Sequence, residues 1–184
     1  MCQKLRAIHC DSHELEGGVI GQLTQKQSGA YYTPDGVVST LLRWAVRNSE
    51  DRMIDPACGD GRFIAGHHNA VGIEQDVRVA RIAMERVPWA LVHEGDFFAW
   101  AAKTTERFDC AAGNPPFIRY QQFSGATRSR AIELCGRLGA DFSGLASSWA
   151  PFLVAAAGLL KAGGRLAFVV PSEIGHGALR GTAS

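Results

Sequence analysis

Apolar residues in this chain fall into two kinds of segment that alternate from about residue 34 to residue 170. Short continuous apolar runs are typical of the buried strands of a parallel sheet, and longer segments with apolar residues every three or four positions are typical of helices. The short runs predict strands at residues 52–54, 70–73, 90–92, 108–112 and 165–170. The longer segments predict helices at residues 34–47, 62–67, 77–87, 131–138 and 147–161. This alternation predicts an α/β fold with a mostly parallel sheet and right-handed crossovers.

Polar and turn-forming residues mark the ends of these elements. Thr33 is expected to cap the helix at 34–47, and Pro88 is expected to end the helix at 77–87. Gly163 and Gly164 are expected to turn the chain from the last helix into the last strand.

A glycine-containing loop, Asp55-Pro56-Ala57-Cys58-Gly59-Asp60-Gly61, follows the first predicted strand and opens a helix. Glycines let the backbone turn tightly and approach a ligand, and the helix amino terminus presents unpaired N–H groups. The glycines are spaced GxG only, and two carboxylates accompany them. The loop therefore predicts a site for a cationic or hydroxyl-bearing nucleotide ligand, rather than a pyrophosphate site.

Acidic residues close the next two predicted strands. Glu74 lies about 20 residues beyond the start of the loop, where nucleotide-binding α/β units place the acid that holds ribose hydroxyls. Asp96 and Phe97 follow the third strand, where a carboxylate accepts from an adenine amine and an aromatic ring packs beside it. Each acid taken alone is better explained as a helix cap or a solvated turn residue, and it is their occurrence at successive strand ends that favours a ligand site.

The tetrapeptide Asn114-Pro115-Pro116-Phe117 follows the fourth predicted strand. The prolines fix an extended backbone whose carbonyl groups face no sheet partner, Asn114 adds a side-chain oxygen, and Phe117 offers an apolar face for stacking. Asn-Pro and Pro-Pro pairs also mark ordinary turns, but here they accompany the glycine loop and the two acidic positions. Together these features predict a site that methylates a planar nitrogen.

These motifs, in this order, resemble those of class I S-adenosylmethionine-dependent methyltransferases, and more narrowly the gamma group of adenine-N6 DNA methyltransferases. The resemblance runs from residue 30 to about residue 171 and includes a Tyr-Thr-Pro segment ahead of the glycine loop. It implies a Rossmann-like sheet, S-adenosyl-L-methionine as cofactor, duplex DNA as partner, and a target adenine rotated out of the duplex. The catalytic residues that it implies are Asn114, Pro115, Pro116 and Phe117. The cofactor-binding residues that it implies are Tyr32, Thr33, Pro34, Asp55, Pro56, Ala57, Cys58, Gly59, Glu74, Gln75, Asp96, Phe97 and Asn114.

Composition adds few constraints. The 184 residues are 46% hydrophobic with a formal net charge of +1, which predicts one core and gives no overall basic character. Five cysteines without a CxxC pair, and the lack of an apolar segment long enough to span a bilayer, predict a cytoplasmic protein with reduced thiols. His9, Cys10 and His13 are better explained by an irregular tail than by a metal site, so no metal is expected.

Basic residues are locally enriched after the tetrapeptide. The residues expected to contact nucleic acid are Arg119, Tyr120, Arg128 and Arg130. Four arginines between residues 119 and 137 face one acid, which suits the steering of phosphates, although a solvated helix explains them equally well.

The resemblance is incomplete toward the end of the chain. Five strands are predicted where seven are expected, so the last strands, and a target-recognition region or a separate specificity subunit, are expected to lie elsewhere. The expected organisation is an N-terminal tail at 1–29, an incomplete catalytic domain at 30–174 and a C-terminal tail at 175–184. Three alternatives stay open: methylation of a glutamine amide in a protein, methylation of a purine amine in RNA, or an inactive cofactor-binding remnant.

Overall fold

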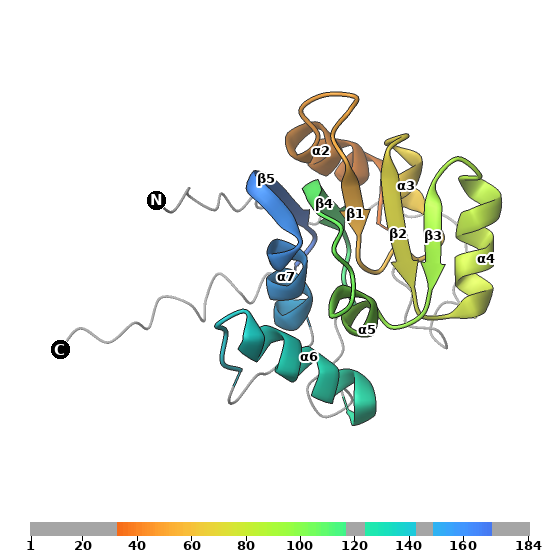
Figure 1. Ribbon diagram of the computed structural model, residues 1–184. Coiled ribbons are helices and arrows are strands. Elements are labelled where there is room, and N and C mark those ends of the chain that lie inside the picture. The colour runs from red at the N-terminus through yellow and green to blue at the C-terminus, as the bar shows by residue number, and fades with distance from the viewer. Residues whose placement is uncertain (1–32, 117–123, 143–148, 171–184) are drawn as a thin grey trace, which may run out of the picture. The chain divides into compact units, whose positions relative to one another are not determined.

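The computed structural model describes residues 33–116, 124–142 and 149–170, all of which fall within one compact unit, Ala30–Val170. Five strands form one sheet in the order β3-β2-β1-β4-β5, and every pair of neighbours is parallel. The strands are β1 (Met53–Asp55), β2 (Ala70–Glu74), β3 (Leu91–Glu94), β4 (Phe108–Gly113) and β5 (Leu160–Phe168). The predicted α/β fold with a mostly parallel sheet is confirmed (Figure 1).

Helices cover both faces of the sheet (Figure 1). On one face, α2 (Asp35–Ala45), α3 (Arg62–Ala65) and α4 (Val77–Arg86) pack on the strands. On the other face lie α5 (Phe97–Ala101), α6 (Gly125–Arg137) and α7 (Trp149–Gly158). Each face has its own apolar cluster, because alternate residues of the central strands point to opposite sides of the sheet. Met53 thus belongs to one cluster and its neighbour Ile54 to the other.

Three elements differ from the prediction. Helix α5 was not predicted, because a helix of five residues has too little length for a helical period to show. Helix α6 begins at Gly125, six residues earlier than expected. Strand β5 begins at Leu160 and includes Gly163 and Gly164, which were expected to form a turn before it.

The two glycines do mark an irregularity inside β5. From Phe108 to Cys110 the register advances two positions along β4, while it advances five positions along β5, from Leu160 to Arg165. Gly163 has φ +76°, a left-handed conformation that suits glycine and accommodates the extra residues. The predicted turn is therefore a bulge within the strand.

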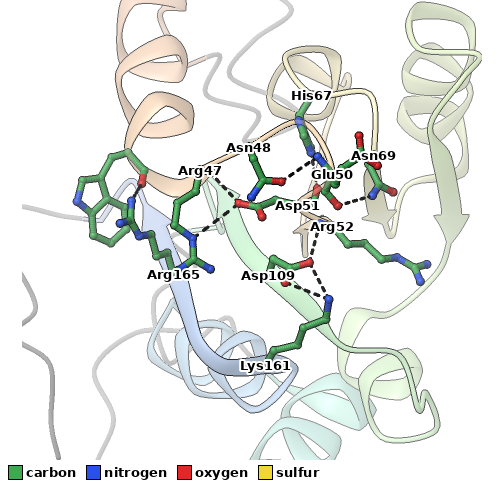
Figure 2. A network of polar contacts seen from close by, with 11 residues as sticks. Arg47, Asn48, Glu50, Asp51, Arg52, His67, Asn69, Asp109, Lys161 and Arg165 are labelled. Carbon is green, nitrogen blue, oxygen red and sulfur yellow. Dashed lines mark hydrogen bonds and ion pairs between the residues drawn. The ribbon is translucent and has the colours of Figure 1, made fainter.

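A polar network closes the amino edge of the sheet, where β1 and β4 begin (Figure 2). Asp109 accepts hydrogen bonds from the backbone N–H of Arg52 at 2.9 Å and from Lys161 Nζ at 2.8 Å. Arg165 donates to the backbone oxygen of Trp44 at 2.6 Å, and its guanidinium lies 5.4 Å from the centre of the Trp44 ring. The network ties the end of α2 to β5, and it lies opposite the edge at which the sequence motifs fall.

Within the described ranges, no helix is long and apolar enough to cross a bilayer.

Candidate active site

The carboxyl ends of β1 to β4 lie at one edge of the sheet, and each of the four sequence motifs follows one of these ends. The order of the strands brings the glycine loop after β1 between Glu74, at the end of β2, and Asn114, which follows β4. In parallel sheets ligands bind outside the carboxyl ends of the strands, where loops rather than a hydrogen-bonded ladder face solvent.

The glycine loop after β1 has the tight conformation that its sequence predicts. Gly59 has φ +55° and Gly61 has φ +88°, both in the left-handed region where a side chain is strained. A side chain at Gly61 would also come within 3.2 Å of Ala83 in α4, whereas the space beside Gly59 is open. Gly61 is therefore required for packing, and Gly59 leaves the backbone accessible to a ligand.

Glu74 holds the glycine loop in place. Its Oε2 accepts from the Gly59 N–H at 3.0 Å, and its Oε1 accepts from the Asp76 N–H at 2.8 Å. The Cys58 N–H adds a bond of 2.9 Å to the backbone oxygen of Ile73. Each carboxylate oxygen keeps a second lone pair, so the same group can still accept from a ligand hydroxyl.

Asp55 is 1% exposed at the end of β1. Burial raises the pKa of its carboxyl group to about 8, a hydrogen bond from the Ala57 N–H opposes this rise, and the nearby charge of Glu74 adds to it. An acid in this environment is stabilised in its charged form by a cation placed beside it. Asp55 thus suits a positively charged ligand group.

Asp60, the second carboxylate of the glycine loop, forms ion pairs with two arginines. Its Oδ2 lies 2.7 Å from Arg86 Nη1 and 3.4 Å from Arg62 Nε, and Arg62 also bonds Asp35 at the start of α2. These ion pairs connect the glycine loop to α2 and α4. Of the two loop carboxylates, Asp60 is thus already engaged by arginines of the protein itself.

Asp96 acts as a helix cap and also keeps an oxygen available. Its Oδ1 accepts from the Ala99 N–H at 2.7 Å and so caps α5. Its Oδ2 is buried without a hydrogen-bond partner among the described residues. The cap interpretation and the ligand interpretation of Asp96 are therefore compatible. Phe97 is 3% exposed, and its ring stacks on Phe152 in the core.

Asn114 has one end of its amide bonded and the other end unbonded. Its Nδ2 donates to Thr33 Oγ1 at 3.1 Å, while its Oδ1 is buried without a partner among the described residues. Thr33 is 7% exposed and does not cap α2, whose N-cap is Pro34 with no side-chain cap bond. The capping role predicted for Thr33 is therefore wrong, because its hydroxyl oxygen accepts from Asn114 instead. A buried carbonyl oxygen without a partner costs stability, and a ligand amine would satisfy it.

The other predicted site residues have varied environments. Pro56 and Pro115 are fully buried, Ala57 and Pro116 are half-buried, and Gln75 is exposed at the end of β2. On α6, Arg130 lies 3.9 Å from Asp96 Oδ1, and Arg128 is half-buried. Tyr32, Phe117, Arg119 and Tyr120 lie outside the described residues.

Two features of the site were missed from the sequence. The Thr33 to Asn114 hydrogen bond joins residues 81 positions apart, so no local pattern indicated it. Gly113 was also overlooked, although a glycine directly before Asn-Pro-Pro indicates a close approach of the backbone to another group. A side chain there would lie 2.4 Å from Asp55 Oδ1. Glycine is what allows β4 to end against the carboxyl group of Asp55.

No group of three or more His, Cys, Asp or Glu residues in the described ranges is arranged to hold a metal ion. His9, Cys10 and His13 lie outside those ranges.

The sequence of this chain matches the models of two families of DNA methylases. Residues 72–181 match the model of the Eco57I restriction-modification methylase family, and residues 18–91 match that of the N-6 DNA methylases. The chain belongs to the Eco57I restriction-modification methylase family.

Relatives of this Eco57I-family chain include a Type II methyltransferase and a tRNA methyltransferase. It is 29% identical over 158 residues to the Type II methyltransferase M.TthHB8I of Thermus thermophilus, covering 78% of this chain and 35% of that protein. It is 27% identical to a tRNA1(Val) (adenine(37)-N6)-methyltransferase of Enterobacter sp., covering 77% of this chain and 59% of that protein. This chain therefore spans about a third of the length of the Thermus relative.

The fold is shared with solved class I methyltransferases. A putative class I S-adenosylmethionine-dependent methyltransferase from Listeria monocytogenes superposes with a TM-score of 0.63 at 20% identity, covering 83% of this chain and 50% of that one. The Rossmann-like class I sheet expected for this chain is thereby confirmed.

Proposed function

We propose that this Eco57I-family chain contributes the catalytic site for transfer of a methyl group from S-adenosyl-L-methionine to the N6 amine of adenine in DNA. The observation that carries the proposal is the Asn114 amide, whose oxygen is buried and unbonded at the end of β4 while its nitrogen is held by Thr33. This oxygen lacks a hydrogen-bond donor, and an amine with two protons can supply one.

The residues at the carboxyl edge fit the cofactor. Asp96 Oδ2 is a second buried acceptor without a described partner and suits an adenine amine. Glu74 suits the ribose hydroxyls, the open space beside Gly59 allows close approach, and Asp55 suits the cationic end of the cofactor. Thr33, Pro34, Pro56, Ala57, Cys58, Gln75 and Phe97 would line the same region, with Tyr32 from outside the described residues. When bound, the cofactor supplies an electrophilic methyl group.

The chain's own residues prepare the target amine. The lone pair of an adenine amine is delocalised into its ring, so the nitrogen is a poor nucleophile. Asn114 Oδ1 and the Pro115 carbonyl would each accept a hydrogen bond from one of the two amine protons. These bonds favour a pyramidal nitrogen with a localised lone pair, so fixed dipoles rather than a strong base carry the catalysis. Pro116 keeps the backbone extended, and Phe117 would stack on the base. The base would be rotated out of the duplex to reach them.

DNA contacts would come from Arg119, Tyr120, Arg128 and Arg130, through phosphates rather than base edges. Because Arg130 also lies near Asp96, we expect its guanidinium group to interact both with that carboxylate and with a DNA phosphate. Sequence readout would need a target-recognition region or a specificity subunit beyond the residues described.

Methylation of RNA is the second candidate, favoured by the similarity to the tRNA adenine-N6 methyltransferase over 59% of that protein. An adenine amine in an unpaired RNA loop presents the same two protons and needs no base rotation.

The test begins with calorimetry of S-adenosyl-L-methionine binding to the full-length protein. Transfer of labelled methyl groups to duplex DNA, to tRNA and to a glutamine-containing peptide is then compared, with the modified base identified by mass spectrometry. We expect N6-methyladenine in DNA, abolished in Asn114→Ala and retained in Asn48→Ala, an exposed asparagine at the opposite edge. Methylated tRNA alone would favour the second candidate, a methylated peptide would favour the amide alternative, and binding without any transfer would indicate a remnant.

A further inference from the structure

We propose that binding of S-adenosyl-L-methionine makes the carboxyl group of Asp55 release a proton to solvent, so that cofactor binding is coupled to pH; this inference rests on the proposed function. The carboxyl group lies at the end of β1 and is 1% exposed. Among the described residues its hydrogen-bond donor is the Ala57 N–H, which lies 3.1 Å from Oδ1. A charged carboxylate in such a place is costly unless a cation lies beside it.

The groups packed around Asp55 shield it from solvent. A carbon added to Gly113 would lie 2.4 Å from Oδ1 and 3.2 Å from Oδ2, so the end of β4 lies close to both oxygens. In the loop that follows β1, Pro56 and Cys58 are buried, and burial raises the pKa of the Cys58 thiol, which therefore stays neutral. Solvent thus does little to stabilise a negative charge on Asp55.

The charged groups on either side of Asp55 are acidic. Glu74, at the end of β2, opposes the ionisation of Asp55 by its own negative charge. The arginines that flank the glycine loop, Arg62 and Arg86, pair with Asp60 instead. In the part of the chain that the structure describes, Asp55 forms no ion pair. The free protein therefore holds Asp55 as a neutral acid near neutral pH, with its pKa raised to about 8, chiefly by burial.

The amino group of the cofactor is the cation that matches this carboxyl group. An ammonium group carries three N–H donors, whereas a sulfonium group carries a positive charge without a donor. An ammonium group beside Asp55 would stabilise the carboxylate both by its charge and by a hydrogen bond. The neutral acid and the cationic ligand then become an ion pair and one free proton, and the ammonium group keeps its own protons.

This coupling gives cofactor affinity a definite pH dependence. A proton bound to Asp55 competes with the cofactor, so the association constant should rise about tenfold per pH unit from about pH 5.5 to about pH 7. The rise should level off near pH 8, because Asp55 is then largely ionised in the free protein and the α-amino group of the ligand begins to lose its own proton.

Calorimetry of the full-length protein counts the released protons. Titrations in MES and in imidazole buffer differ in observed enthalpy, because each buffer takes up the released protons with its own ionisation enthalpy. At about pH 6.5 we expect about one proton released per S-adenosyl-L-methionine bound. S-Adenosylhomocysteine, which keeps the amino group and lacks the sulfonium charge, should release the same number. The analogue of S-adenosylhomocysteine with hydrogen in place of the amino group should bind more weakly and release none.

Two variants identify the source of the proton. Asp55→Asn keeps an oxygen for the Ala57 N–H but has no proton to release, so it should bind the cofactor without proton release and with little pH dependence. Asp109→Asn, at the opposite edge of the sheet, should behave like the wild type. If Asp55→Asn does not fold, infrared difference spectra of the wild type decide, because the band of a protonated carboxyl group should disappear when the cofactor binds.

Each result separates this coupling from the proposed function. Cofactor binding by the wild type without proton release, or undiminished release in Asp55→Asn, would overturn the coupling and leave the proposed function intact. Release with S-adenosyl-L-methionine but not with S-adenosylhomocysteine would overturn the role of the amino group. A wild-type protein that binds no S-adenosyl-L-methionine would overturn the proposed function and this coupling with it.

Discussion

Gly113 and Asp55 are in such close contact that a single added carbon on Gly113 would lie 2.4 Å from Asp55 Oδ1. The two residues end adjacent strands, β4 and β1, and Asp55 is almost completely buried. The contact brings the Asn-Pro-Pro segment beside the glycine loop, so the geometry of the whole carboxyl edge depends on it.

Gly113→Ala is expected to reduce the free energy of unfolding by about 1–3 kcal/mol, because the carboxyl group of Asp55 is buried, accepts a hydrogen bond from the Ala57 N–H and would have to shift. Chemical denaturation followed by circular dichroism measures the change. Gly136→Ala is the matched control, since a side chain at that helical position meets nothing within 4 Å. The control should be neutral or slightly stabilising. Equal stability of the two variants would show that β4 shifts easily.

Glu74→Gln is expected to lower stability by about 1–3 kcal/mol, because an NH₂ group would replace one of two oxygens that each accept a backbone N–H. Affinity for S-adenosyl-L-methionine should fall with it, as the Gly59 loop is released. Glu94→Gln is the control, because Glu94 pairs in register with Glu74 on β3 and is exposed. Thermal melts and calorimetry compare the two variants, and a loss of the same size in Glu94→Gln would contradict the role of Glu74.

The pH dependence of stability should carry the signature of Asp55. In the unfolded chain this carboxyl group ionises near its ordinary pKa of 3.8, whereas burial raises the pKa to about 8 in the folded protein. Between these values the folded state holds a proton that the unfolded state has released. The contribution of Asp55 to stability therefore falls as pH rises from about 4 to 8, by about 1.4 kcal/mol per pH unit.

Asp55→Asn removes this titration and keeps an oxygen for the Ala57 N–H. The variant should gain stability relative to the wild type as pH rises from 5 to 8, as measured by urea unfolding at each pH. Asp109→Asn should show no such change between pH 5 and 8, because the hydrogen bond from Lys161 lowers the pKa of Asp109. The stabilisation from Asp109 is present above its ordinary pKa and is lost as pH falls below it. Parallel curves for Asp55→Asn and the wild type would refute the elevated pKa of Asp55.

Arg165→Ala tests whether the two edges of the sheet are independent. Loss of the bond to the Trp44 backbone oxygen and of the contact with its ring should cost about 1 kcal/mol of stability. The dissociation constant for S-adenosyl-L-methionine should stay unchanged, because Arg165 lies in the network at the amino edge (Figure 2). Arg43→Ala, an exposed arginine beside Trp44, is the control for the loss of a positive charge. A weakened affinity in Arg165→Ala would reveal coupling between the edges.

Much of the fold was predictable from local patterns. Short apolar runs identified the five strands within a few residues, because a buried parallel strand must be apolar on both faces. The exception is β5, which begins earlier than its apolar run predicted. The glycine loop was equally predictable, since Gly59 and Gly61 adopt the left-handed conformations that favour glycine over other residues. Helix α5 was missed because five residues are too short to show a helical period, and the start of α6 was missed because residues 125–130 contain too few apolar side chains.

The sequence by itself determined that Asp55, Glu74, Asp96 and Asn114 lie at the ends of strands. Each of them ends or follows a short apolar run, which is a local feature of the chain. Only the tertiary structure decided how these residues are used. It placed Asp60 between two arginines, assigned the hydroxyl group of Thr33 to Asn114 rather than to a helix cap, and left one oxygen each on Asp96 and Asn114 without a described partner. Such contacts join residues far apart in the chain, and local periodicity carries no information about them.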